Sequence, residues 1–84
     1  MSRIDDTLAA VSAATRQVEE SVKAIATAAT EAHETHDLLA GAGAESAVEL
    51  MGRSRDALDR AIDLGRSLID VLEEAATAAA AAKG

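Results

Sequence analysis

The chain has 84 residues, a net charge of −7 and no Phe, Trp, Tyr, Pro or Cys. The missing cysteines exclude disulfides and thiolate chemistry, and the missing aromatic rings remove the platforms on which single-stranded nucleic acid stacks. The negative charge repels nucleic acid and anionic lipid, and no apolar run approaches the roughly 20 residues that cross a bilayer, so we expect neither a nucleic-acid partner nor membrane insertion.

Residues 3–40 are predicted to form one long helix. Ser2 and Asp5 make a capping pair before it, and Asp5 and Asp6 lie where the helix dipole favours negative charge. Apolar and small residues then recur in alternating steps of four and three, which places them in one stripe that packs against another helix. This stripe consists of Ile4, Leu8, Val11, Thr15, Val18, Val22, Ile25, Ala29, Ala32, His36 and Leu39. Small residues flank it, namely Ser12, Ala14, Ser21, Ala26 and Ala28.

The segment Gly41-Ala42-Gly43 interrupts the pattern and predicts a tight turn. We expect Gly41 to end the first helix in the left-handed conformation, with Gly43 as a second flexible point. So short a connection leaves room only for an antiparallel neighbour. The predicted register pairs residues whose numbers add up to about 85, which brings Glu19 level with Arg66.

A second helix is predicted over residues 44–78, followed by a frayed Ala-rich tail at 79–84. Its stripe repeats the same steps and comprises Ala44, Val48, Met51, Arg55, Leu58, Ile62, Gly65, Ile69, Leu72, Ala76 and Ala79. We call the two stripes together the seam. Its larger apolar residues are the predicted hairpin core, namely Val11, Val18, Val22, Ile25, Leu58, Ile62, Ile69 and Leu72.

The second helix carries a further apolar row beside its stripe, which we call the outer row. It comprises Ala47, Leu50, Ala57, Ala61, Leu64, Leu68 and Val71, and charged residues occupy the opposite side. Stripe and outer row together are wider than one partner helix buries. We therefore predict that Leu50, Leu64, Leu68 and Val71 form an association face. The expected fold is a single all-α domain over residues 1–84, an antiparallel two-helix hairpin that dimerises into a four-helix bundle.

One segment resembles a chemical site. His33 and His36 lie three residues apart on one helix face and are weak candidates for holding a metal ion. The competing interpretations are a polar seam residue (His36) beside a flanking residue (His33), or a pH-sensitive contact. The carboxylate pairs are sequence neighbours on solvated faces, and no catalytic triad is present. We expect no enzyme activity, no cofactor and no metal.

Four seam positions depart from the apolar pattern. Thr15, His36 and Arg55 are polar, and such residues fix register and oligomeric state or are tolerated at partly exposed positions. Gly65 lies in mid-helix at a cost of about 1 kcal/mol relative to Ala, which suggests a close approach of the helices there.

The short length, the two long antiparallel helices, the central glycine turn and the acidic Ala-rich composition resemble those of the WXG100 (ESAT-6-like) group of small actinobacterial proteins. The start of the chain, Met1-Ser2-Arg3-Ile4-Asp5-Asp6, has no signal-peptide pattern, as in that group. The group's Trp-x-Gly turn is replaced here by Leu39-Ala40-Gly41 or Ala42-Gly43, and no tyrosine is present for its Tyr-x-x-x-Asp/Glu signal. The resemblance implies dimeric four-helix bundles handled by type VII secretion.

The functional expectation is a non-enzymatic interaction module that self-associates, serving as a secretion-associated adaptor. Its partner is itself or another helical protein, and its expected location is the cytoplasm, with signal-peptide-independent export left open. One alternative is a structural subunit of a filament or shell, in which the Ala-rich tail supplies an additional packing strip. A minor alternative is a metal- or ligand-binding bundle that uses His33 and His36.

Overall fold

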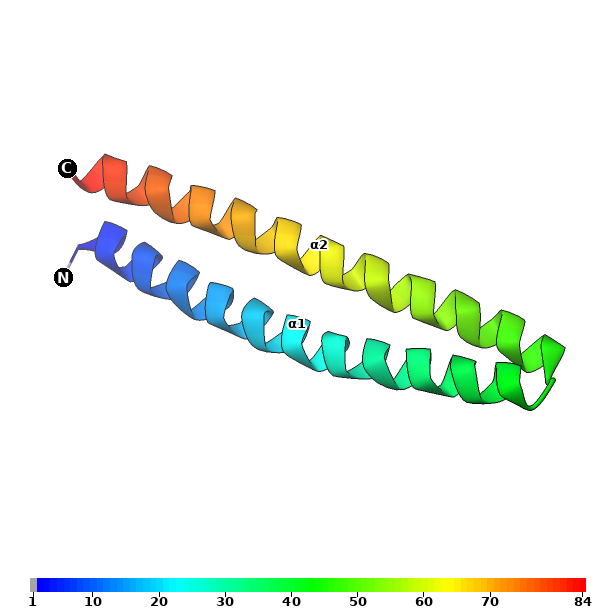
Figure 1. Cartoon of the computed structure of the whole chain (residues 1–84). Coiled ribbons are helices and arrows are strands. Elements are labelled where there is room, and N and C mark those ends of the chain that lie inside the picture. The colour runs from blue at the N-terminus through cyan, green and yellow to red at the C-terminus, as the bar shows by residue number, and fades with distance from the viewer. Residues whose placement is uncertain (1) are drawn as a thin grey trace.

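The computed structural model describes residues 2–84 and shows two long helices running side by side, joined at one end by a short turn (Figure 1). Helix α1 spans Arg3–Gly41 and helix α2 spans Glu45–Lys83. The start of α1 and the end of α2 lie at the end of the hairpin opposite the turn (Figure 1). The prediction of an all-α antiparallel hairpin is confirmed.

The first turn of α1 is capped as the sequence predicts. The Asp5 amide donates to Ser2 Oγ at 3.1 Å, and the Asp6 amide donates to the Ser2 carbonyl at 3.1 Å. The first bond satisfies one of the amides that have no partner inside the helix, and the second is the first i→i−4 bond of the helix. Asp5 and Asp6 lie in this turn, where their charge is favourable to the helix dipole.

The turn corrects the predicted role of Gly41. That residue is still helical, Ala42 keeps right-handed angles (φ −85°, ψ −6°), and Gly43 takes the positive φ of 74°. The Gly43 amide donates to the Ala40 carbonyl and the Ala44 amide donates to the Leu39 carbonyl, both at 3.2 Å. This pair of bonds is the Schellman motif with Gly43 as residue C′.

The C-terminal end of α2 also differs from the prediction. The helix continues to Lys83, past the expected end at residue 78, so residues 79–83 are helical rather than frayed. Alanine is the best helix former, and nothing in this segment interrupts the helix before Gly84. Ala79 is half-buried, and Lys83 Nζ lies 2.5 Å from Asp5 Oδ1, so the last turn of α2 contacts the first turn of α1.

The register is shifted from the predicted one. Gly65 faces Val22 and Gly52 faces His36, so residues whose numbers add up to 87 or 88 lie level. The shift follows from the turn, because the chain reverses at Gly43 and not at Gly41. Arg66 therefore lies near the level of Val22, and the predicted pairing of Glu19 with Arg66 is not formed.

The apolar contact between the helices lies along the seam, and the ion pairs of His33 with Asp59 and of Lys83 with Asp5 join the helices beside it. Every seam residue is at least half-buried, including the eight of the predicted hairpin core. Within residues 2–84 only Ala29 and Ala32 are buried, each 5% exposed. Two helices thus shield their seam only in part, because no third element covers it.

The polar seam residues are satisfied within their own helices. Thr15 Oγ1 donates to the Val11 carbonyl at 2.9 Å, and the Arg55 guanidinium donates to Asp56 Oδ1 at 3.3 Å. His36 Nδ1 lies 3.4 Å from Asp37 Oδ1. None of these polar interactions crosses the seam, so in the hairpin they do not select the register.

Two glycines of α2 lie against α1 at different distances. A Cβ at Gly65 would lie 2.5 Å from Val22 Cγ2, so the helices approach there as closely as a glycine allows. A Cβ at Gly52 would meet the His36 ring at 3.8 Å, which is ordinary van der Waals contact. Only Gly65 is therefore required by packing.

We expect Gly52→Ala to stabilise the protein by up to about 1 kcal/mol, since alanine is the better helix former. Gly65→Ala gains the same propensity but forces Val22 to move, so we expect a net loss of about 1–2 kcal/mol. Urea unfolding followed by circular dichroism at one fixed protein concentration measures both. Equal stabilisation by the two substitutions would contradict the close approach, and Val22→Ala should relieve the effect of Gly65→Ala.

The turn offers a second matched pair. Gly43→Ala places a side chain in the left-handed region and should cost about 1–2 kcal/mol. Gly41→Ala is the control, because Gly41 is helical and no atom lies within 4 Å of its added Cβ. The same unfolding measurement should show Gly41→Ala neutral or stabilising, and a larger loss at Gly41 would overturn the assignment of the turn.

Candidate interaction surface

The hairpin is one helix thick in its shortest direction, with extents of 61 × 15 × 11 Å. It exposes 5870 Å² of surface, whereas a compact monomer of 8.5 kDa exposes about 4,650 Å². The difference of about 1,200 Å² per chain comes from the elongated single layer. The shape therefore leaves more surface in water than a folded chain of this mass normally does.

The large side chains of the outer row lie in this excess surface. Leu50, Leu64, Leu68 and Val71 are 63%, 70%, 47% and 58% exposed. Leu64, Leu68 and Val71 come from successive turns of α2, and Leu50 lies about four turns before them. These are the four residues that the sequence assigns to the association face. Leu38 of α1 is exposed further, at 75%, and the sequence analysis did not select it. The sequence does indicate its exposure, because Leu38 directly precedes the seam residue Leu39, just as each outer-row residue precedes a seam residue of α2.

The outer row has a fixed angular relation to the seam. Each of its residues directly precedes a seam residue, as Leu64 precedes Gly65 and Leu68 precedes Ile69. One residue corresponds to a rotation of about 100° around the helix axis. Helix α2 therefore presents two faces about 100° apart, and only one of them is covered by α1.

The residues that directly follow a seam residue are charged where those of the outer row are apolar. On α2 most of them are charged, namely Glu45, Glu49, Asp56, Asp59, Asp63, Arg66, Asp70 and Glu73. His33 follows a seam residue of α1, and its Nε2 lies 3.5 Å from Asp59 Oδ2. This contact bridges the helices, so the residues after the seam lie on one face of the hairpin, which we call the acidic face.

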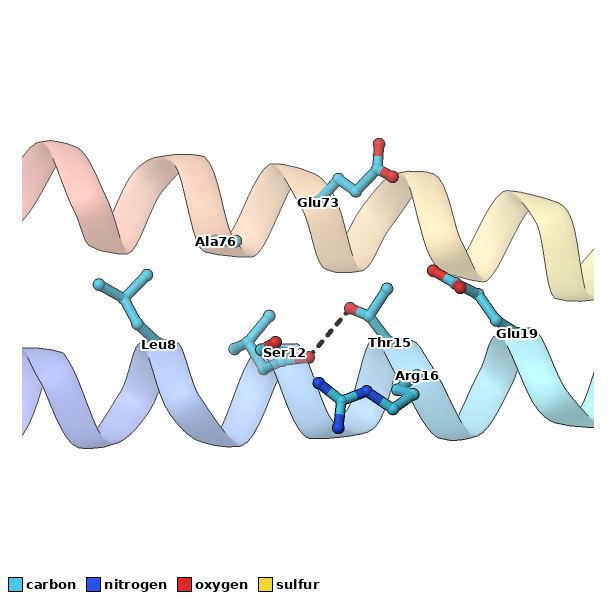
Figure 2. A pocket seen from close by; sticks show the side chains of 8 residues that line it. Leu8, Ser12, Thr15, Arg16, Glu19, Glu73 and Ala76 are labelled. Atoms are coloured by element: carbon cyan, nitrogen blue, oxygen red, sulfur yellow. Dashed lines mark hydrogen bonds between the residues drawn. The ribbon is translucent and has the colours of Figure 1, made fainter.

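An open hollow of about 480 Å³ lies on the acidic face between the helices (Figure 2). Its lining includes Ser12 of α1 and Ala76 of α2, whose short side chains leave the space unfilled. In Figure 2 Leu8 and Glu19 point toward α2, whereas Glu73 points away from α1. The polar groups do not converge on a common point, so the arrangement does not resemble a built ligand site.

The two candidate metal ligands engage different groups. His33 faces Asp59 on the other helix, while His36 faces its neighbour Asp37 and packs against Gly52. Within residues 2–84 no group of three or more His, Asp or Glu side chains is arranged to hold a metal ion. The structure does not bring a third ligand to this pair.

The open end of the hairpin has one perturbed carboxyl. A hydrogen bond from Lys83, followed by hydrogen bonding from Ser2, lowers the pKa of Asp5 below its ordinary value. Both favour the charged carboxylate. The ion pair joins the first turn of α1 to the last turn of α2, on a solvent-exposed part of the molecule.

No helix among residues 2–84 combines the length and the apolar character that crossing a membrane requires. The chain matches no known protein family, no curated protein and no solved structure. Its hairpin shape and its length of 84 residues are consistent with the WXG100 shape, and no further likeness accompanies them.

We expect Lys83→Ala to raise the pKa of Asp5 toward its ordinary value, as measured by NMR titration of the carboxyl carbon. Because folding lowers this pKa, the pairing stabilises the protein above the ordinary pKa and loses its effect as the pH falls through the lowered value. Lys83→Ala should therefore weaken the fold at neutral pH and have little effect in strong acid. An unchanged Asp5 pKa in the variant would contradict the ion pair.

Proposed function

We propose that the protein is a non-enzymatic helical interaction module and that its partner is a second copy of the same chain. The observation that carries this proposal is the exposure of Leu50, Leu64, Leu68 and Val71 in one row of α2. Burying a leucine or valine side chain is worth about 1.5–3 kcal/mol, so leaving four in water is costly for an isolated hairpin. An apolar row of this length is typical of an association surface.

The available area suits a closed dimer. Each chain exposes about 1,200 Å² more than a compact monomer, and a stable interface buries about 800 Å² on each partner. The excess surface of one chain is therefore large enough to supply a stable interface with one further hairpin.

The angular relation of the two faces of α2 also supports this partner. In a square four-helix bundle each helix contacts two neighbours at right angles, and the seam and the outer row lie about 100° apart. The seam contacts α1, so the outer row is oriented toward a helix of the second hairpin.

Charge supports the same orientation. The chain carries a net charge of −7, and its acidic residues gather on the face that follows the seam. Two copies that met through their acidic faces would repel each other. Packing through the outer row instead leaves both acidic faces in water, on opposite sides of the bundle.

The resemblance to WXG100 proteins extends the proposal to a biological role. It implies an adaptor that assembles in the cytoplasm and is exported without a signal peptide. The support is the hairpin shape, the length and the acidic Ala-rich composition. Detection of the tagged protein in culture medium, with a cytoplasmic protein as a lysis control, tests this part separately from self-association.

Size-exclusion chromatography with light scattering, run over a hundredfold range of concentration, tests the proposal. A constant mass of two chains supports a closed dimer. A mass that keeps rising with concentration supports the structural alternative, a filament or shell, and overturns the closed dimer. A monomer throughout the range overturns self-association, and the outer row would then belong to the interface with a different protein.

We expect Leu64→Glu combined with Leu68→Glu to raise the dimer dissociation constant at least a hundredfold, because two apolar contacts per chain are replaced by charge. The matched control is Thr30→Glu combined with Thr77→Glu, which adds the same charge at exposed positions on the acidic side of the seam. Sedimentation equilibrium gives the constants, and circular dichroism checks that helix content is kept. A double-leucine variant with the mass and affinity of the control would refute the assignment.

A further inference from the structure

Helix α1 carries its own nearly uncharged row on the same side of the hairpin as the outer row. It is formed by the residues that directly precede the seam positions of α1, and we call it the small row. Its members are Arg3, Thr7, Ala10, Ala14, Gln17, Ser21, Ala24, Ala28, Glu31, Thr35 and Leu38. In an antiparallel pair the flanks that precede the seam lie on one face, just as His33 and Asp59, which follow it, meet on the other.

The two rows differ in size along their length. In the observed register Leu64 lies level with the segment between Ser21 and Ala24, and Leu68 lies level with the segment between Gln17 and Ser21. Leu64 and Leu68 are thus accompanied at the same level by small residues of α1, and Val71 is accompanied by the longer but uncharged Gln17. The turn end is the exception, where the exposed Leu38 lies level with the exposed Leu50.

We infer that the second copy packs its α2 onto α1 of the first hairpin, with the two turns at the same end of the bundle. This inference rests on the proposed self-association and specifies its geometry. A two-fold axis parallel to the helices generates the arrangement and keeps every residue at its own level. Large side chains of one copy then enter the small row of the other at both new helix contacts, as knobs enter holes.

The other two-fold packing places the turns at opposite ends. It sets α2 against α2 and α1 against α1, so that large residues meet large ones and small residues meet small ones. Two rigid hairpins cannot be widely spaced at one contact and closely spaced at the other without leaving a void, and voids are costly.

Leu38 separates the two arrangements as well. With the turns at the same end it meets Leu50 of the other copy, and two of the most exposed apolar side chains are covered together. With the turns at opposite ends it lies against the first turns of α1, near Arg3 and Thr7. Only the first arrangement gives Leu38 an apolar partner.

The experiment uses Ser21→Cys and Leu64→Cys, because the chain has no native cysteine and both residues are exposed. Both also lie at the middle of their helices, which span 3–41 and 45–83. Packing with the turns at opposite ends therefore brings each residue next to the same residue of the other chain. Packing with the turns at the same end brings Ser21 of one chain next to Leu64 of the other. A disulfide forms only where the Cα atoms come within about 7 Å.

The two variants are oxidised separately and also after being unfolded, mixed and refolded together. We expect the mixed disulfide in up to half of the dimers of the mixture and little disulfide in either variant alone. Disulfides in the separate samples, or a light-scattering dimer without the mixed disulfide, would overturn the inference while leaving self-association intact. A monomer by light scattering would instead overturn the proposed function. Ala13→Cys, exposed and away from both faces, is the control and should form no disulfide with Leu64→Cys.

Discussion

An uninterrupted period of seven residues runs along both helices and keeps one stripe of each turned toward the other over their whole length. The other features of the hairpin depend on this constraint. Because the contact is a single seam, Ala29 and Ala32 are the only residues between 2 and 84 that become buried, and most seam side chains remain partly in water. Because the seam never slips, the residues on either side of it also form continuous rows.

Those two rows give the hairpin one apolar face and one acidic face. A shift of one residue turns a side chain by about 100°, so the residues before and after the seam point to opposite faces. On α2 the row before the seam contains leucine, valine and alanine, whereas the row after it is largely acidic. The proposed assembly follows from this difference. Exposing the apolar face to water costs free energy, whereas the acidic face is well solvated and carries like charge.

The register is determined by sterics and by the turn rather than by polar pairing. Thr15, His36 and Arg55 bond within their own helices, so a displaced partner helix would leave those bonds unchanged. Gly65 differs, because only a glycine fits against Val22 there. The Schellman bonds around Gly43 fix the length of the turn, and the close approach at Gly65 keeps the helices aligned with it.

The sequence alone determined the two helices, their antiparallel pairing, the N-terminal cap and the composition of the rows, because periodicity and capping are local properties of the chain. The tertiary structure decided which glycine turns the chain, the register that it sets, the continuation of α2 to Lys83 and the pairing of His33 with Asp59. It also showed that the exposed Leu38 lies level with the exposed Leu50. These features depend on where one helix lies along the other, and that position is set by the backbone bonds of the turn and by close packing, which the seven-residue pattern does not specify.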